Sequence, residues 1–262
     1  MLKQRLIPVL FIKNGFIVRS ENFVSHKIIG NVVNEVRRYN QWDIDELVYI
    51  DISREIGYDS KRDDHKIQRV NSIDEILELI SKECFMPLSF GGGIRDVQTI
   101  TKFLKNGADK VILNTMLHEN PEEVKKAVAI FGAQAIVASI DYKMIDHQMV
   151  FYKNYGRTQL EGIGINQMIE RVTNIGCGEI FLNSIDRDGA AEGYDLTAIK
   201  QVVNLTNVPV IACGGATDTF DFEETAKIEN LSGIAAGNMF HFTENAYPRS
   251  KKTLKRKNYN FR

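Results

Sequence analysis

The chain contains 262 residues, 44% of them hydrophobic and 26% charged, with a formal net charge of −1. So small a net charge gives no overall field to attract nucleic acid, and no apolar run approaches the ~18 residues of a membrane-spanning helix, so we expect neither partner. The three cysteines, at positions 84, 177 and 213, lack metal-binding or redox spacing, so we expect no metal, no cofactor and a reducing, cytoplasmic compartment.

Apolar runs alternate with helical patterns along the first half of the chain. Strands are predicted at residues 5–13, 46–52, within 87–93 and at 108–113, and a short ribbon at 16–23. Helices are predicted from about 29 to 39, at 72–82, 96–106 and 120–131, with a capping box at Ser72 and a cap at Asn120 before Pro121. The polar stretch 53–71 is long for a strand-to-helix link, which is typical of a functional or mobile loop.

The same alternation continues through the second half. Strands are predicted at residues 134–141, 179–184 and 209–213, with an eighth beginning near 233. Helices are predicted at 163–175, 195–206, near 220–228 and at the basic C-terminus, and a hairpin within 144–162. Strict alternation of strands and helices favours a parallel sheet.

Two stretches of the first half of the chain recur in the second half. Residues 209–218 match 87–96, each with an apolar run, a glycine pair and a closing aspartate, and residues 137–143 match 7–13. Eight strand–helix units with such a repeat predict one (β/α)8 barrel over 1–262, built from half-barrels at roughly 1–132 and 133–262. The alternative is an open doubly wound sheet, but no G-x-G-x-x-G supports a dinucleotide fold.

Glycine-rich loops follow several of the strands, and backbone amides there can hold a phosphate. One site is predicted from the first half and another from the second, which suggests a long substrate with a phosphate at each end. The first comprises Gly92, Gly93, Asn114 and Thr115, and the second comprises Asp188, Gly189, Gly214, Gly215, Ala236 and Gly237. A single glycine pair would more simply be a tight turn, but two copies in register favour phosphate loops.

Asp141 is the strongest candidate for a general acid or base. It ends the predicted fifth strand, where barrel active sites lie, and the half-repeat aligns it with Phe11. Its alternative role is that of a capping or salt-bridged aspartate. Asp51, Asp186 and Asp188 are weaker candidates.

Four charged residues stand at or just before the starts of strands. They are Arg5, Glu46, Lys110 and Glu179. Two of each sign at the bottom of a barrel could close its axis as a ring. From the residues alone, a stabilising ion-pair cluster is the favoured interpretation.

Together these motifs resemble the cyclase subunit of imidazole glycerol phosphate synthase, a histidine-biosynthesis family, along nearly the whole chain. The resemblance rests on residues 5–15, 46–52, 91–95, 107–111, 178–179, 186–189, 193–195, 214–215 and 240–242. It implies a barrel that adds ammonia to a bis-phosphorylated ribulosyl-formimino nucleotide. It also implies a separate glutaminase subunit docked at the N-terminal face, with the four charges as an ammonia gate and Asp109 facing the glutaminase.

This sequence differs from the family at one of the two catalytic positions. The family uses two aspartates, at the ends of strands one and five; Asp141 matches the second, but Phe11 occupies the first position. Because a phenyl ring cannot transfer a proton, the loss typically removes a factor of ~10²–10⁴ in rate. Gly237 also stands where the family usually has serine, a milder change.

Three functions therefore remain open. One is an active cyclase, a lyase of histidine biosynthesis. Another is a paralogue that keeps the ammonia route and the glutaminase dock but has lost cyclisation, resembling ammonia-delivery partners of a sugar amidotransferase in surface-polysaccharide or flagellin glycan synthesis. A phosphosugar isomerase is the third, but it would also need an acid at position 11 and would have no need of the charge ring.

Overall fold

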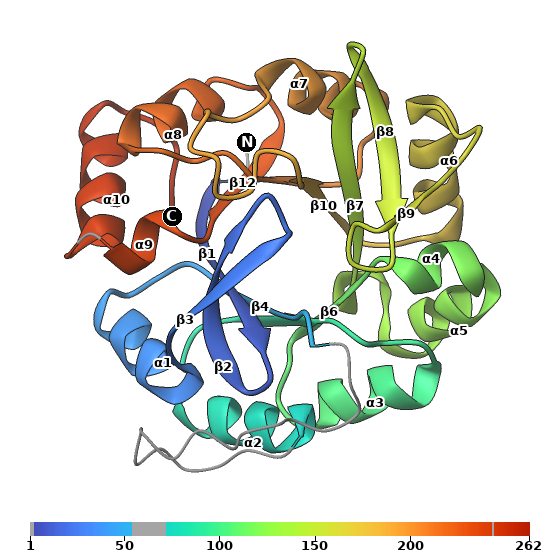
Figure 1. Cartoon of the computed structure of the whole chain (residues 1–262), viewed down its shortest axis with the longest axis horizontal. Helices are drawn as coiled ribbons and strands as arrows, with labels where there is room; N and C mark the ends of the chain where they lie inside the picture. The colour runs from blue at the N-terminus through green and yellow to red at the C-terminus, as the bar shows by residue number, and fades with distance from the viewer. Residues whose placement is uncertain (1–2, 54–71, 243) are drawn as a thin grey trace.

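The computed structural model describes residues 3–53, 72–242 and 244–262, and it has the predicted (β/α)8 architecture. Eight of its strands pair in parallel around a closed barrel, because the last of them pairs back with the first (Figure 1). These strands are β1 (Arg5–Lys13), β4 (Leu47–Asp51), β5 (Leu88–Gly91), β6 (Lys110–Leu113), β7 (Ile136–Ile145), β10 (Glu179–Ser184), β11 (Val210–Cys213) and β12 (Leu231–Ala236).

Helices surround the barrel on its outside (Figure 1). They are α1 (Val32–Gln41), α2 (Ile73–Glu83), α3 (Val97–Lys105), α4 (Thr115–Glu119), α5 (Pro121–Phe131), α6 (Ile165–Ile175), α7 (Leu196–Leu205), α8 (Thr219–Ala226), α9 (Met239–Phe242) and α10 (Ala246–Arg256), with a 3₁₀ turn at Ala133–Ala135. The predicted N-cap at Ser72 accepts a hydrogen bond from Glu75 N at 3.3 Å. Asn120 does occupy the N-cap of α5, but without a side-chain capping hydrogen bond.

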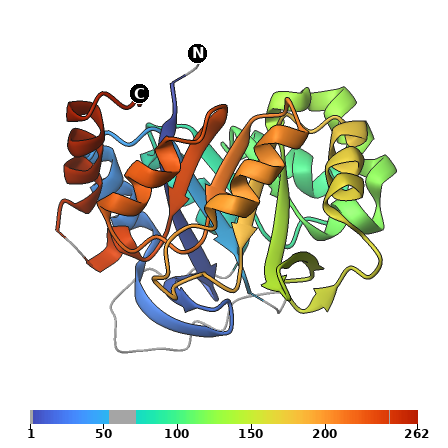
Figure 2. The same cartoon turned by 90° about the horizontal axis from the view of Figure 1, so that it is seen from above.

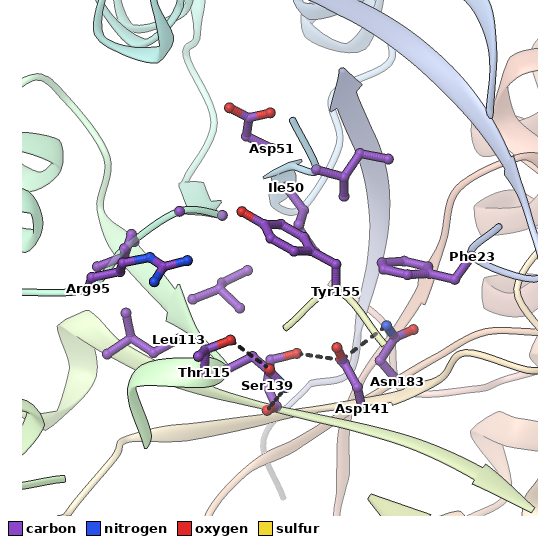
Figure 3. A pocket seen from close by; sticks show the side chains of 16 residues that line it. Phe23, Ile50, Asp51, Arg95, Leu113, Thr115, Ser139, Asp141, Tyr155 and Asn183 are labelled. Atoms are coloured by element: carbon purple, nitrogen blue, oxygen red, sulfur yellow. Dashed lines mark hydrogen bonds between the residues drawn. The ribbon is translucent and has the colours of Figure 1, made fainter. Parts of the chain in front are cut away.

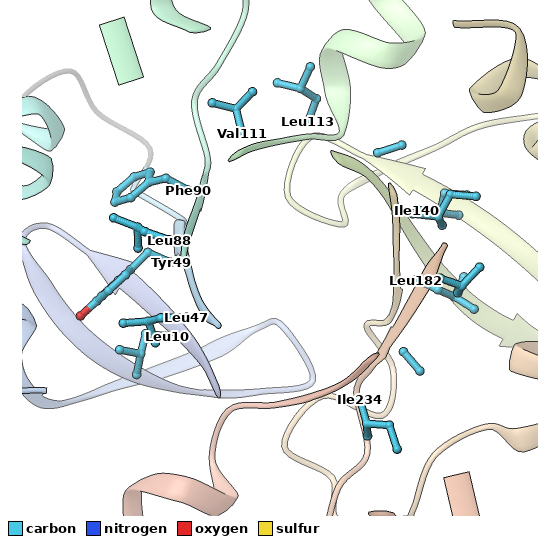
Figure 4. Close-up of a cluster of buried hydrophobic side chains, with 14 of the residues drawn as sticks. Leu10, Leu47, Tyr49, Leu88, Phe90, Val111, Leu113, Ile140, Leu182 and Ile234 are labelled. Atoms are coloured by element: carbon cyan, nitrogen blue, oxygen red, sulfur yellow. The ribbon is translucent and has the colours of Figure 1, made fainter. Parts of the chain in front are cut away.

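Side-chain alternation along each barrel strand divides the apolar core in two. On β1, Leu6, Leu10 and Ile12 belong to a cluster that includes helix residues and therefore lies between the strands and the helices. Figure 4 shows members of this outer cluster pointing away from the barrel axis. Ile7 and Phe11 belong to a second cluster, whose buried members come mainly from the barrel strands and which fills the barrel interior.

The two ends of the barrel carry different structures (Figure 2). The first described residues and the C-terminal residues lie together at the N-terminal face, where Gln4 N donates to Asn260 O at 2.7 Å. The opposite face, called here the mouth, carries two antiparallel ribbons. One is formed by β2 (Phe16–Glu21) and β3 (Ser25–Asn31), and the other by the outer part of β7 with β8 (Gln148–Lys153) and β9 (Thr158–Gln159).

Three predicted boundaries change. The ribbon after β1 runs to Asn31, so α1 begins at Val32 rather than near 29, with Asn31 Oδ1 capping Val33 N at 2.9 Å. The fifth barrel strand does not end at Asp141: β7 continues to Ile145, because its outer half pairs with β8 in the predicted hairpin.

The predicted functional loop at 53–71 lies outside the described residues except for Ser53. Within the described residues, no helix combines the length and apolarity needed to cross a membrane.

Candidate active site and charged ring

Asp141 lies where β7 leaves the barrel wall for the mouth. Its Oδ1 accepts hydrogen bonds from Ser139 Oγ at 3.0 Å and from Asn183 Nδ2 at 3.2 Å (Figure 3). Asn183 is its direct partner on β10, and Ser139 shares its inward face on β7. Burial raises the pKa of Asp141 to about 6, although the two hydrogen bonds oppose that rise. A carboxyl group with such a pKa can both accept and donate a proton near neutral pH.

The structure places Phe11 at the inner wall of the same mouth. Its ring is buried and meets the ring of Phe23 edge to face, with 5.4 Å between centroids and 86° between planes. Phe23 lies between β2 and β3, so the ribbon that follows β1 folds back over Phe11. The phenyl group of Phe11 therefore packs against Phe23 beside the mouth, and it has no proton to transfer to a ligand.

The predicted first phosphate site comes together around one pocket. Gly92, Gly93, Asn114 and Thr115 all line the pocket that also contains Asp141. The Asn114 amide donates to Ser139 O and to Tyr152 O, both at 3.2 Å, and Thr115 Oγ1 accepts from Asn154 N at 3.0 Å. These side chains thus fix the loop after β6 against β7 and β8 at the edge of the pocket.

The predicted second phosphate site does not line this pocket. Asp188 O accepts from Asn22 N at 2.6 Å, and Asn238 Nδ2 donates to Ser20 O at 2.7 Å. The β2–β3 ribbon therefore lies against the loops that hold Gly189 and Gly237. Burial also raises the pKa of Asp188 to about 6. Gly214, Gly215 and Ala236 follow or end β11 and β12 on the same side of the barrel.

The two weaker acid candidates have separate positions. Asp51 lines the pocket, and its Oδ1 accepts from Ser53 N at 2.8 Å. Asp186 instead accepts from Met144 N at 2.8 Å and from Ser184 Oγ at 2.7 Å, so it braces the β7–β8 hairpin against β10. Asp186 is thereby a structural residue in this geometry.

The four charged residues at the strand starts form a continuous ring. Arg5 bonds both Glu46 and Glu179, and Lys110 Nζ lies 3.0 Å from Glu46 Oε1 and 2.9 Å from Glu179 Oε2. Ser89 Oγ adds a hydrogen bond to Glu46 at 2.7 Å. Burial acts to raise the pKa of Glu46, but Arg5 and Lys110 outweigh it and the pKa is lowered. Asp109, next to Lys110, is exposed and accepts from Leu88 N at 2.8 Å.

An apolar section of the barrel interior separates the ring from the mouth. It contains Ile7, Val48, Val137, Phe181, Ile211 and Ala235. Each of these side chains is almost fully buried and points inward from a barrel strand. All six side chains are apolar, so a small molecule moving from the ring to the mouth would pass no charge among them.

Some residues at the site were absent from the sequence prediction. Arg95 and Tyr155 line the pocket, and Ser139 and Asn183 hold Asp141. Ser139 precedes Asp141 by two residues and so had to share its face of the strand, which was a usable signal. Asn183 could be found only through the pairing of β7 with β10.

In the described part of the chain, no group of three or more His, Cys, Asp and Glu side chains could hold a metal ion.

Comparison with known proteins gives a consistent result. Residues 5–246 match the model of a family described as histidine biosynthesis protein. Proteins named imidazole glycerol phosphate synthase subunit HisF are similar over almost the full length. The protein from Leuconostoc mesenteroides is 34% identical over 97% of this chain and 96% of its own. Those from Caulobacter vibrioides (35%; 97% and 94%) and Natranaerobius thermophilus (36%; 98% and 98%) agree.

Proposed function

The chain belongs to the histidine biosynthesis protein family as a relative of the imidazole glycerol phosphate synthase cyclase subunit, and from that premise we propose that it delivers ammonia through its barrel. In this proposal ammonia enters at the N-terminal face, passes the charged ring and reaches a phosphorylated ligand at the mouth. The ring and the apolar section above it support such a route, because a neutral molecule of this size loses little solvation there whereas an ammonium ion loses much more.

The ammonia source in this proposal is a separate glutaminase subunit bound to the N-terminal face as a heterodimer. No cysteine of this chain sits in a glutaminase-like G-x-C-x-G sequence, so the chain itself does not supply the nucleophile. Asp109 supports the placement: it is exposed on the face where the ring opens and lies beside Lys110. A partner cation opposite Asp109 would align its ammonia outlet with the ring.

Cyclisation of the ribulosyl-formimino nucleotide is impaired in this proposal. Asp141 keeps the geometry of a proton carrier, but Phe11 leaves it without the second carboxylate of the family. The proposal rests on the presence of phenylalanine at position 11. The loss of one positioned acid or base corresponds to a factor of ~10²–10⁴ in rate. The acceptor of ammonia could then be a sugar, supplied through a sugar amidotransferase. The intact Asp141 and first glycine loop favour the alternative of an active cyclase.

Cyclase turnover tests this directly. The purified chain would receive the ribulosyl-formimino nucleotide with a high concentration of ammonium salt, which bypasses the glutaminase, and loss of substrate absorbance would be followed. We expect negligible turnover by the natural chain and a gain in Phe11→Asp. The double variant Phe11→Asp with Asp141→Asn is the matched control and should be inactive. Efficient turnover by the natural chain would contradict the proposal.

We also propose that the single domain over 1–262 consists of two half-barrels, at roughly 1–132 and 133–262. Gly92 and Gly214 support this. Both have positive φ, +103° and +98°, and a Cβ on either would collide with a carbonyl oxygen of the preceding barrel strand. That oxygen is Asp51 O at 2.0 Å in the first half and Ser184 O at 2.4 Å in the second. The two turns are thus built in the same way.

A further inference from the structure

We infer that a basic groove between α1 and α10 binds an acidic, extended segment of a partner protein. The groove is lined by Trp42 and Asp43, just after α1, and by Pro248, Lys251, Lys252, Lys255 and Arg256 on α10. None of these residues lines the pocket of Asp141 or belongs to the charged ring. The inference therefore goes beyond the proposed function and does not depend on it.

The last helix concentrates positive charge in a chain that is otherwise acidic. Six basic residues lie between positions 249 and 257, and no acidic residue follows Glu244, although the formal net charge of the whole chain is −1. Two of the six are paired, since Lys251 Nζ lies 2.7 Å from Asp45 Oδ1 and Lys257 Nζ lies 2.6 Å from Glu223 Oε2. The other four are exposed and form no ion pair among the described residues; they are Arg249, Lys252, Lys255 and Arg256.

Three of these cations line the groove along one side of α10. Pro248, Lys252 and Arg256 follow one another at intervals of four residues, so they lie on consecutive turns of the same helix face. The helix dipole favours cations in the last turn, which accounts for Lys255 and Arg256 but not for Lys252. Like charges four residues apart repel each other and oppose helix formation. An anionic partner would replace this repulsion with attraction.

Trp42 forms the opposite wall of the groove and is held in place. Its ring meets the ring of Tyr39 with 5.4 Å between centroids and 68° between planes, and Arg38 Cζ lies 5.0 Å from its centroid. The indole packs against the outer apolar cluster but stays partly exposed. A fixed and partly exposed aromatic ring of this kind is suited to an apolar side chain of a partner.

The groove is preformed, because α10 is bonded to the segment that follows α1. Asp45 N donates to Tyr247 Oη at 3.0 Å, and Lys251 Nζ donates to Asp45 Oδ1 at 2.7 Å and to Asp43 O at 3.4 Å. The first and last helices are neighbours around the barrel because β12 pairs with β1 (Figure 1). A volume of about 560 Å³ accommodates several side chains of a ligand and not only a single ion.

The lining of the groove favours a protein segment over a nucleic acid. Asp43 is exposed in the same groove and would repel a phosphodiester, whereas a backbone N–H of an extended peptide can donate to its carboxylate. Glutamate or aspartate side chains of that peptide can reach Lys252 and Arg256 while an apolar neighbour covers Trp42. A single indole also lacks the series of stacking surfaces that single-stranded nucleic acid uses.

The fluorescence of Trp42 tests the inference, because Trp42 is the only tryptophan of the chain. A short peptide of glutamates around one central phenylalanine would be titrated into the full chain. Binding should change the emission of Trp42 and should weaken as salt is added, since exposed charges are screened. The same peptide with glutamine in place of every glutamate should not bind.

Matched double variants locate the binding site. Lys252→Gln with Lys255→Gln should weaken binding of the acidic peptide about 10-fold or more. Lys125→Gln with Lys126→Gln removes the same charge from the exposed face of α5 and should leave the affinity unchanged. Circular dichroism would verify that each variant is folded. The inference would be overturned by no binding of the acidic peptide, by equal weakening in both double variants, or by tighter binding of a single-stranded DNA of equal charge.

Discussion

Lys110 Nζ lies 2.9 Å from Glu179 Oε2 and holds a buried glutamate that Arg5 also contacts from the other side. Two cations therefore share two anions, Glu46 and Glu179, and each carboxylate contacts both cations. Such a ring balances its charges only while it is complete, because each member has lost solvation that only its partners replace. The ring is for this reason a stability element as well as the proposed entrance for ammonia.

Removing one member should be costly. Glu46→Gln leaves Arg5 and Lys110 with a single carboxylate between them, and we expect a loss of about 3–5 kcal/mol in the free energy of unfolding, measured by urea denaturation. The matched control is Glu122→Gln, which breaks an exposed pair with Lys125 and should cost about 0.5 kcal/mol or less. An equal, small cost for both variants would show that the ring is not a tightly coupled unit.

The pKa of Glu46 gives the ring a pH dependence. Because that pKa is lowered below the ordinary 4.5, the stability that Glu46 contributes is present above 4.5 and is lost as the pH falls through the folded-state value. The natural chain should therefore lose stability on acidification below about pH 4.5 more steeply than Glu46→Gln. Urea midpoints at pH 3.5 and pH 6 for both chains would measure the difference, and parallel curves would contradict it.

The barrel could be read from the sequence because its signals are local. The apolar runs at residues 5–13 and 179–184 predicted strands, and the repeated glycine turns predicted the loops that follow two of the strands. The β2–β3 ribbon could not be predicted as far as Asn31: β3 is polar, with Lys27 exposed, and is held by pairing to β2 alone among the described strands. The cover over Gly189 was equally hidden, since the bond from Asn22 to Asp188 joins residues far apart in sequence.

Asp141 should have the opposite pH dependence from Glu46. Burial raises its pKa to about 6 from an ordinary 3.8, so its contribution to stability is fully present below about pH 4 and is lost as the pH rises through 6. Asp141→Asn keeps an oxygen for Ser139 and Asn183 but carries no charge. Relative to the natural chain, it should gain about 2–3 kcal/mol between pH 4 and pH 8. The exposed Asp146→Asn is the control, and a pH-independent difference for Asp141→Asn would refute the raised pKa.

Phe11→Asp should couple a second carboxyl group to Asp141. Two carboxylates in one desolvated mouth repel each other, so the pair should titrate in two steps, with the upper one above pH 6. Carboxyl carbon NMR of aspartate-labelled protein would follow both groups. Phe11→Asn provides the neutral control, in which Asp141 should titrate in one step near its value in the natural chain. A single unshifted titration in Phe11→Asp would mean that positions 11 and 141 do not share one site.

The glycine turn after β5 offers a comparison between neighbouring residues. A Cβ on Gly92 would lie 2.0 Å from Asp51 O, 2.8 Å from Asp51 C and 2.8 Å from Asp51 N, all of them backbone atoms that cannot move without displacing β4. A Cβ on Gly93 would meet nothing within 4 Å, so only its φ of +68° opposes a side chain. Gly92→Ala should therefore cost about 3 kcal/mol or more in unfolding free energy, and Gly93→Ala only about 1 kcal/mol.

Ligand binding separates the two variants further. Gly93→Ala adds a methyl group in the pocket, at the predicted first phosphate site, so it should weaken the binding of ribose 5-phosphate, used as a small phosphorylated probe, about 10-fold or more while the fold loses only about 1 kcal/mol. Thermal unfolding with and without ribose 5-phosphate measures both effects in one experiment, because bound ligand raises the midpoint. If Gly93→Ala kept the full ligand-induced rise in midpoint, the phosphate would have to lie elsewhere than on the loop after β5.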